Sequence, residues 1–350
     1  MAKELRVGIN GFGRIGRLVA RAMLERGGFK VCAVNDIIDA KDFAKGVKFL
    51  AKLFEFDSTQ GRFAGKVEYN DTQIVVNGTP IDVLSIKNPE ELPWAKYDLD
   101  FVVESTGVFR KREQCEMHLK AGAKKVLLTV PPKDDVDAII VCGVNDGDLK
   151  PEHKILSNAS CTTNCLAPVV KVLHEQFGLV RGMMTTIHAY TNDQRILDMY
   201  HKEDLRRARS AAINLIPTST GAAKTIGKII PELAGRLDGI AVRAPVPTGS
   251  LVDFVCELER IQVRDPKEMA KEVNAAIRAA AEGPMKGVLE YSTDELVSTD
   301  IVHNPHSSIF DSKQTMVMPN SRMVKILTWY DNEWGYSNRC VDLVRTAGEL

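Results

Sequence analysis

The run SNASCTTNC over residues 157–165 places a cysteine, Cys161, where the first turn of a helix is expected. Small and hydroxylated residues flank this cysteine, and an apolar pattern with helical spacing follows over 166–173. The unpaired N–H groups and the dipole of a helix start favour a thiolate, which is the form of cysteine that attacks carbonyl carbon. We therefore interpret Cys161 as a nucleophile. The alternative is a small buried residue without chemistry, which is what most cysteines are.

Two basic residues further along the chain could act with this thiol. His188 lies near the end of a β-branched strand pattern over 182–191 and is the natural base for a thiol proton, although strand histidines are commonly structural. Arg243 lies in an apolar, strand-like run, where a charge is costly unless it is paired. Its fork suits a phosphate or carboxylate, and a salt bridge within or between subunits is the alternative. The hydroxyl-rich run 218–221 could hold phosphate or simply cap the helix that follows it.

The N-terminal region has the pattern of a dinucleotide site, in which a strand, a Gly-x-Gly-x-x-Gly turn and a helix follow one another over 5–24. Gly11 would make the tight turn, Gly13 would let the backbone approach a pyrophosphate, and Gly16 would let the helix pack on the strand. A second strand leads into Asp36, where an acid would bind ribose hydroxyls and repel a 2′-phosphate. The sequence therefore predicts NAD as the cofactor, with a plain turn residue as the alternative reading of Asp36.

The remaining pattern predicts two domains of different architecture. Buried-type strands, with Thr129 at the end of one of them, and a helix at 113–121 continue a parallel sheet, while Asn77-Gly78 indicates an antiparallel hairpin. Long strands and a helix at 266–281 follow in the second half. We predict an α/β protein: a Rossmann dinucleotide-binding domain over 1–160, completed by a C-terminal helix at 333–350, and an α+β catalytic domain over 161–332 with a mostly antiparallel sheet.

The composition points to small-molecule partners. The chain has 46 Lys and Arg against 46 Asp and Glu, so no global charge recruits nucleic acid or an anionic membrane. It shows neither a signal-peptide pattern nor an apolar run long enough to span a membrane. Seven scattered cysteines indicate reduced thiols and a cytoplasmic protein. Cys161 and Cys165 lack a second ligand pair at a known spacing, so no metal is expected.

Together these runs closely resemble the phosphorylating glyceraldehyde-3-phosphate dehydrogenases. The resemblance covers essentially the whole chain and is carried by the runs 10–17, 160–164, 188–191, 205–209, 217–224 and 329–336. It implies a glycolytic oxidoreductase that uses NAD and inorganic phosphate to convert D-glyceraldehyde 3-phosphate into 1,3-bisphosphoglycerate. It also implies a thioester on Cys161, His188 as the base, and a homotetramer in the cytoplasm.

The resemblance assigns binding roles residue by residue. Around NAD it implies Arg14, Ile15, Asp36, Thr129, Asn332 and the backbone near Lys87. Around the substrate phosphate and inorganic phosphate it implies Ser160, Thr162, Thr191, Thr220, Gly221 and Arg243.

Several segments depart from the family pattern. The segment 37–56 is longer by several residues beside the expected adenosine site, and Tyr200 stands where NAD-using relatives commonly have proline. Glu203 looks inserted, Lys87 replaces a common arginine, and the run 301–306 has no functional interpretation. The alternatives are an erythrose-4-phosphate dehydrogenase, a biosynthetic semialdehyde or acyl-phosphate dehydrogenase, and a nucleotide-occupied binding or regulatory protein. The sequence leaves the physiological direction of the reaction open.

Overall fold

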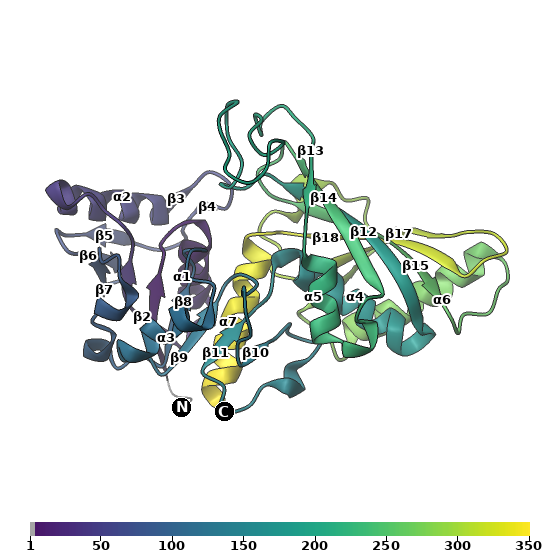
Figure 1. Cartoon of the computed structure of the whole chain (residues 1–350), viewed down its shortest axis with the longest axis horizontal. Helices are drawn as coiled ribbons and strands as arrows, with labels where there is room; N and C mark the ends of the chain where they lie inside the picture. Colours follow the sequence, from purple (N-terminus) through teal and green to yellow (C-terminus); the bar gives the residue numbers. More distant parts are fainter. Residues whose placement is uncertain (1–3) are drawn as a thin grey trace. The chain divides into compact units, whose positions relative to one another are not determined.

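The computed structural model describes residues 4–350, which form two compact units (Figure 1). Unit 1 contains the chain up to residue 140 together with 147–159 and 337–350. Unit 2 contains residues 141–146 and 160–336.

Unit 1 is built on a nine-stranded sheet with the order β10-β11-β9-β8-β1-β2-β7-β6-β5. All pairings from β10 to β7 are parallel, and the last two pairings, at the β5 edge, are antiparallel. The predicted hairpin is confirmed, because Asn77 and Gly78 join β6 to β7 with φ angles of 50° and 83°. The strands are β1 (Leu5–Asn10), β2 (Phe29–Asn35), β5 (Val67–Tyr69), β6 (Gln73–Val76), β7 (Thr79–Leu84), β8 (Phe101–Glu104), β9 (Lys125–Leu128), β10 (Ala138–Ile139) and β11 (Ile155–Ser157).

The helices of unit 1 follow its strands, as expected for a parallel sheet. They are α1 (Arg14–Arg26), α2 (Phe43–Glu55), α3 (Arg112–Lys120) and most of α7 (Trp334–Glu349), with short 3₁₀ turns at η1 (Ala40–Asp42), η2 (Pro89–Glu91), η3 (Trp94–Tyr97) and η4 (Asp146–Asp148), the last of which begins in unit 2. A two-residue ribbon, β3 (Phe56–Asp57) with β4 (Gly61–Arg62), follows α2. The C-terminal helix contacts the end of α1 and the start of β2, since Asp342 pairs with Arg26 and Arg345 stacks on Phe29.

Unit 2 is built on a seven-stranded sheet with the order β13-β14-β12-β15-β18-β17-β16. The pairings β12/β14 and β16/β17 are parallel and the others are antiparallel, so the sheet is mostly antiparallel, as predicted. The strands are β12 (Leu179–Ala189), β13 (Ile216–Ser219), β14 (Leu237–Ala244), β15 (Ser250–Leu258), β16 (Leu289–Ser292), β17 (Ser308–Val317) and β18 (Met323–Tyr330). The helices are α4 (Cys161–Phe177), α5 (Ala222–Ile229) and α6 (Pro266–Glu282), with 3₁₀ turns at η5 (Pro231–Leu233) and η6 (Ser298–Ile301).

One face of the unit 2 sheet carries its helices. Strand β15 is buried at every second residue, which is the pattern of a strand with one covered face. Helix α4 packs on β12, β15, β17 and β18, and α6 packs on β16 and β17. Packing on these strands therefore fixes the position of α4, and the first turn of that helix carries the predicted nucleophile. The predicted fold class, a Rossmann-type unit followed by a unit with a mostly antiparallel sheet, is confirmed.

Candidate active site

Cys161 is the first residue of α4, as the sequence predicts. The helix starts at Ser160, whose Oγ accepts a hydrogen bond from Thr163 N–H at 3.0 Å. Thr163 Oγ1 in turn donates to Ala222 O at 3.3 Å, which joins the first turn of α4 to the first turn of α5. The half-buried thiol of Cys161 is thus held at a capped helix start beside a second helix start.

His188 and Arg243 meet beside this thiol. The parallel register of β12 and β14 pairs His188 directly with Arg243. His188 Nε2 lies 3.5 Å from Cys161 Sγ, and Arg243 Nη1 lies 2.7 Å from His188 Nδ1. Three residues that are 27 and 55 positions apart along the chain therefore form one cluster. This arrangement supplies a nucleophile, a base and a positive charge to a single site.

The contacts of the two His188 ring nitrogens allow two positions for the ring proton. Ala189 O lies 2.7 Å from Nδ1 and only accepts, whereas Arg243 Nη1 only donates. A ring with its proton on Nδ1 donates to Ala189 and leaves Nε2 free to accept the thiol proton. A ring with its proton on Nε2 accepts from Arg243 and donates toward the sulfur. Each neutral tautomer therefore has a partner at Nδ1, so the ring can act first as a base and then as a donor.

Burial controls the protonation of this cluster. Burial raises the pKa of the Cys161 thiol, although the Arg243 charge and hydrogen bonds from Thr162 and the backbone oppose the change. Burial, assisted by Arg243, lowers the pKa of His188 to about 3. The prediction that the helix start lowers the thiol pKa is therefore wrong for the free protein, because desolvation outweighs the helix-end donors. Near neutral pH the site holds a thiol beside a neutral imidazole.

Arg243 is placed to bind an anion. Its Nη1 donates to Ala189 O and lies 2.7 Å from His188 Nδ1, while its buried Nε has no hydrogen-bond partner among the described residues. A buried donor without a partner costs about 1–3 kcal/mol, so an acceptor at this position would be favoured. The chemistry of a guanidinium fork suits a phosphate or an oxyanion.

Two functional candidates escaped the sequence analysis. Tyr330, at the end of β18, packs edge-on against the His188 ring, and its hydroxyl bonds both Thr162 Oγ1 and Thr186 Oγ1 at 2.9 Å. Ser250 accepts from Ala189 N–H and donates to Asn332 Oδ1 at 2.8 Å. Tyr330 is part of the family-like run at 329–336, which is the one signal that could have indicated it. Together they tie α4, β12 and Asn332 into one network.

The predicted phosphate residues lie in different environments. Thr220 Oγ1 accepts from Ala222 N–H, and Gly221 directly precedes α5, so both lie at the helix start that Thr163 contacts. Thr162 is buried, and its hydroxyl is directed to Tyr330. Thr191 is half-buried and its N–H donates to Gln194. Arg207 donates to Thr218 Oγ1, two residues before Thr220, and to Asp193, two residues after Thr191.

The glycine turn of unit 1 has the shape of a phosphate cradle. A Cβ added to Gly16 would lie 2.0 Å from Gly11 O, so only glycine lets α1 approach β1 this closely. A Cβ added to Gly13 would meet nothing within 4 Å. Gly13 caps α1 with no side-chain hydrogen bond, and Arg14 and Ile15 follow it as the first helical residues. The helix N-terminus thus directs backbone N–H groups toward this turn, which fits a pyrophosphate.

Two other predicted cofactor residues of unit 1, Asp36 and Thr129, directly follow its strands. Asp36 follows β2 and accepts from Phe12 N–H at 3.0 Å, which ties it to the glycine turn. Thr129 follows β9 and donates to Glu104 O. The Arg14 guanidinium is paired with Asp57 at 2.7 Å, so its side chain is committed within the protein. Lys87 lines a cavity of about 690 Å³ formed also by Ile37, Ile38, Asp39, Phe43 and Ser85.

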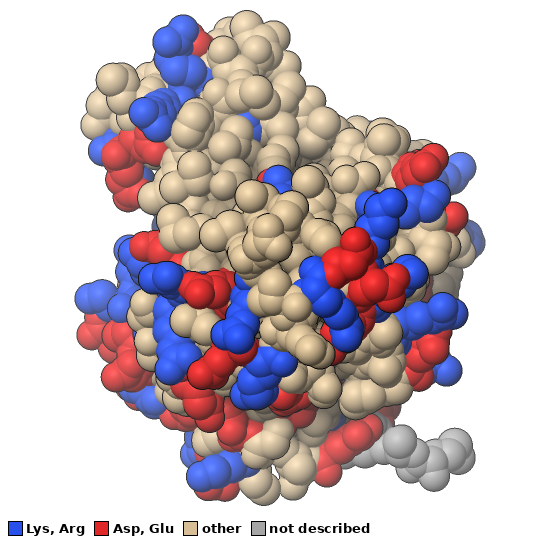
Figure 2. Space-filling view, turned by 90° about the vertical axis from the view of Figure 1, so that its right-hand side faces the viewer, with Lys and Arg blue, Asp and Glu red and all other residues tan. Residues whose placement is uncertain are grey.

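The surface, the helices and the metal-ligating side chains add three observations. On the face seen in Figure 2, Lys and Arg side chains lie among Asp and Glu side chains. Over residues 4–350 no helix has the length and apolarity needed to cross a membrane. Within the same range, no three His, Cys, Asp or Glu side chains gather in a way that could hold a metal ion.

Comparisons with known proteins agree with this geometry. The family description "Glyceraldehyde 3-phosphate dehydrogenase, NAD binding domain" matches residues 5–112, and "Glyceraldehyde 3-phosphate dehydrogenase, C-terminal domain" matches residues 160–332. A glyceraldehyde-3-phosphate dehydrogenase of Geobacillus stearothermophilus is 54% identical over 340 residues, which cover 97% of each chain. Glyceraldehyde-3-phosphate dehydrogenase 2 of Streptomyces avermitilis is 52% identical over 346 residues, 98% of each chain. The chain therefore belongs to the glyceraldehyde 3-phosphate dehydrogenase family and carries its NAD-binding domain.

Proposed function

We propose that the chain catalyses the NAD-dependent oxidative phosphorylation of D-glyceraldehyde 3-phosphate to 1,3-bisphosphoglycerate through a thioester on Cys161. The observation that carries the proposal is the cluster of Cys161 Sγ, His188 Nε2 and the Arg243 guanidinium. The division into a cofactor domain over 1–160 with 333–350 and a catalytic domain over 161–332 belongs to the same proposal.

The first half of the reaction uses the thiol and the imidazole. His188 Nε2 accepts the thiol proton as Cys161 Sγ attacks the aldehyde carbon, so thiolate forms only while the new bond forms. The protonated His188 returns this proton to the aldehyde oxygen, which gives a hemithioacetal with a hydroxyl group on Cys161 and leaves Nε2 free again. His188 then accepts the proton of its hydroxyl as the carbon is oxidised to the thioester. Bound NAD supplies the hydride acceptor for this oxidation.

The second half releases the acyl group to inorganic phosphate. Attack of phosphate on the thioester develops an oxyanion, which the Cys161 N–H at the α4 start and a protonated His188 Nε2 can stabilise. Arg243, with its buried Nε, would hold a phosphate group, together with Ser160, Thr162 and Thr191. Thr220 and Gly221 at the α5 start would hold the other phosphate.

The cofactor would be held mainly by backbone groups. Gly13 and the first residues of α1 would contact the pyrophosphate, and Asp36 would bind the adenosine ribose. Thr129 and the backbone near Lys87 would lie beside the bound molecule. Asn332 has its Oδ1 occupied by Ser250 and Thr248, so its amide nitrogen would donate to the carboxamide of the nicotinamide.

A rate assay that varies the phosphate, the cofactor and the aldehyde tests this function. Cofactor reduction with glyceraldehyde 3-phosphate should depend on inorganic phosphate and should be much faster with NAD, which gives NADH, than with NADP, which gives NADPH. Erythrose 4-phosphate as the better aldehyde would assign the chain to the erythrose-4-phosphate reaction instead. If the protein shows no turnover and Cys161 does not react with iodoacetate, the results would favour a nucleotide-occupied binding protein.

We also propose that the enzyme is a cytoplasmic homotetramer. All seven cysteines are free thiols, which suits a reducing compartment. The segment 196–215 is held by internal contacts such as Arg209 with Asp198 and Ser210 with Ile196 O, yet it turns large apolar side chains to its surface. Each of these side chains is at least 63% exposed, which suits a contact with another copy of the chain: Ile196, Leu197, Met199, Tyr200, Leu205, Ile213 and Leu215.

A further inference from the structure

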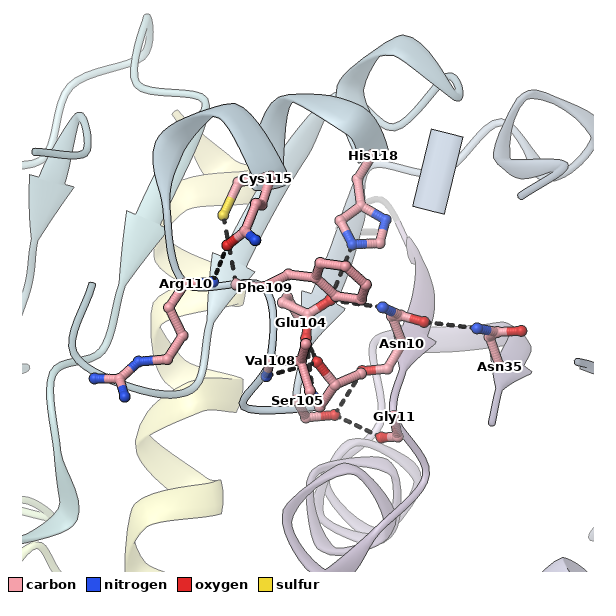
Figure 3. Close-up of polar contacts among 12 residues, drawn as sticks. Asn10, Gly11, Asn35, Glu104, Ser105, Val108, Phe109, Arg110, Cys115 and His118 are labelled. Carbon is pink, nitrogen blue, oxygen red and sulfur yellow. Dashed lines mark hydrogen bonds and ion pairs between the residues drawn. The ribbon is translucent and has the colours of Figure 1, made fainter. Parts of the chain in front are cut away.

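Five buried polar side chains in unit 1 form one hydrogen-bonded chain that the proposed mechanism does not use. Each of the five is at most 3% exposed: Trp94, His118, Glu104, Asn10 and Asn35. Trp94 Nε1 donates to His118 Nδ1 at 3.0 Å, and His118 Nε2 lies 3.0 Å from Glu104 Oε2. Asn10 Nδ2 donates to the same oxygen at 2.6 Å, and Asn35 Nδ2 donates to Asn10 Oδ1 at 2.7 Å. Figure 3 shows Glu104 between His118 of α3 and Asn10, with the contact continuing to Asn35.

The donors in this chain require a carboxylate at residue 104. An indole N–H can only donate, so His118 Nδ1 must accept and the ring proton lies on Nε2, where it is donated to Glu104. The other carboxylate oxygen, Oε1, accepts from Thr106 N–H at 2.9 Å and from the Thr106 hydroxyl. Both oxygens of Glu104 therefore face donors.

This hydrogen-bonded row of side chains lies at the carboxyl ends of the parallel strands, where an open parallel sheet binds its ligand. Asn10, Asn35 and Glu104 are the last residues of β1, β2 and β8, and the register pairs Asn10 with both of the others. The turns that leave these strands are tied to the same residues. Gly11 N–H donates to Asn35 O at 2.8 Å, and Ser105 Oγ donates to Gly11 O at 2.6 Å.

We propose that Glu104 is a positioning residue for the cofactor: supported by His118 and Trp94, it locks the turns after β1 and β8 in their NAD-binding geometry before NAD arrives. The inference rests on the proposed cofactor site at this edge. Turns that are already ordered in the free protein lose little conformational entropy when NAD binds, so ordering them in advance strengthens the affinity for NAD. A buried carboxylate is costly unless its oxygens accept hydrogen bonds. The donors to Glu104 come from Thr106 in the turn after β8 and from Asn10 and His118.

The first test is Glu104→Gln, which keeps the shape and removes one acceptor. Whichever way the amide is turned, its NH₂ faces donors: Thr106 N–H on one side, or Asn10 and His118 on the other. Calorimetric titration with NAD should show a Kd raised by about tenfold or more, while kcat at saturating NAD stays within about threefold. Amide hydrogen exchange in the NAD-free protein should accelerate at Gly11 and Thr106.

A second set of variants keeps the test decisive if Glu104→Gln folds poorly. His118→Leu removes the donor to Glu104 and should raise the Kd by about tenfold, whereas His118→Gln can still donate to Glu104 and accept from Trp94 and should stay within about threefold. His118→Leu should also shift the Trp94 fluorescence, because the indole loses its acceptor. Cys115→Ala is the matched control, since Cys115 is buried on the same helix and its one hydrogen-bond contact among the described residues is to Phe109 O at 4.0 Å, outside the chain of five side chains.

The outcomes separate the inference from the proposed function. If the wild type binds NAD and both Glu104→Gln and His118→Leu bind it within about twofold of wild type, Glu104 does not position the turns. An equal loss of affinity in Cys115→Ala would show general destabilisation and would also overturn the inference. A wild type that does not bind NAD would instead overturn the proposed cofactor site.

Discussion

At the residue scale, the central feature is a thiol and an imidazole that are both neutral at rest. Burial moves the pKa of Cys161 upward and the pKa of His188 downward, which disfavours the charged form of each. The Arg243 charge lowers both pKa values, so it favours negative charge on sulfur and disfavours a resting imidazolium. The site is therefore arranged to hold charge that develops during the reaction.

Replacing the base should slow the chemistry more than it weakens binding. His188→Asn removes the proton acceptor beside Cys161 Sγ, so we expect kcat for NADH formation to fall by about 10²- to 10⁴-fold. The KM for glyceraldehyde 3-phosphate should change far less, because the proposed phosphate contacts remain. Steady-state kinetics measure both. A kcat within a few-fold of wild type would exclude His188 as the base.

The same histidine should make the fold sensitive to acid. The pKa of His188 is about 3 in the folded protein and about 6.5 when unfolded, so the unfolded state binds more protons between these values. The contribution of the neutral His188 to the free energy of unfolding is therefore fully present above pH 6.5 and is lost as the pH falls toward 3. Between pH 7 and pH 5 the wild type should lose about 2 kcal/mol more unfolding free energy than His188→Asn. Urea unfolding at both pH values checks this, and equal losses in the two proteins would contradict it.

At the element scale, two glycines of the α1 turn should respond differently to the same substitution. Gly13→Ala adds a methyl group to open space, so the fold should survive while NAD binding weakens because the methyl lies where the pyrophosphate would approach. Gly16→Ala would push a methyl group against Gly11 O and should destabilise unit 1 by several kcal/mol. Thermal unfolding and NAD titration of both variants measure the contrast. A Gly13→Ala protein with unchanged NAD affinity would contradict the proposed cradle.

The elements that could be predicted from the sequence are those with local signals. The strand, glycine turn and helix over 5–26, the hairpin at Asn77-Gly78 and the capped start of α4 at Ser160 each depend on neighbouring residues. The run around Arg243 indicates a strand, which is β14, but its pairing with β12 cannot be predicted locally because it is made over a long sequence separation.

The contacts of the site could be predicted less well than its residues. Tyr330 bonds Thr162 across 168 positions, and no local pattern reports such a contact. The pKa of Cys161 depends on burial, which a helix-start pattern does not contain, and so that prediction failed. The Trp94, His118 and Glu104 network likewise joins residues whose individual positions look like ordinary core.

At the scale of the whole molecule, the exposed apolar side chains of 196–215 predict self-association. Leu205 and Ile213 are 84% and 80% exposed, so Leu205→Asp with Ile213→Asp would place two charges in the proposed interface. Light scattering should give four chains for the wild type and a smaller assembly for the double variant. Lys202→Asp, on the same segment but charged in the wild type, is the control. A wild type that is monomeric at micromolar concentration would contradict the proposal.

The most direct test of the proposed function is to trap the acyl group on Cys161. The enzyme is mixed with NAD and glyceraldehyde 3-phosphate without inorganic phosphate, quenched in acid, digested and examined by mass spectrometry. We predict a 3-phosphoglyceroyl thioester on the peptide that contains Cys161, carried by that residue and not by the buried Cys165, and its loss when phosphate is added before the quench. An acyl group on another residue, or phosphate-dependent NADH formation by Cys161→Ser at the wild-type rate, would contradict the proposed mechanism.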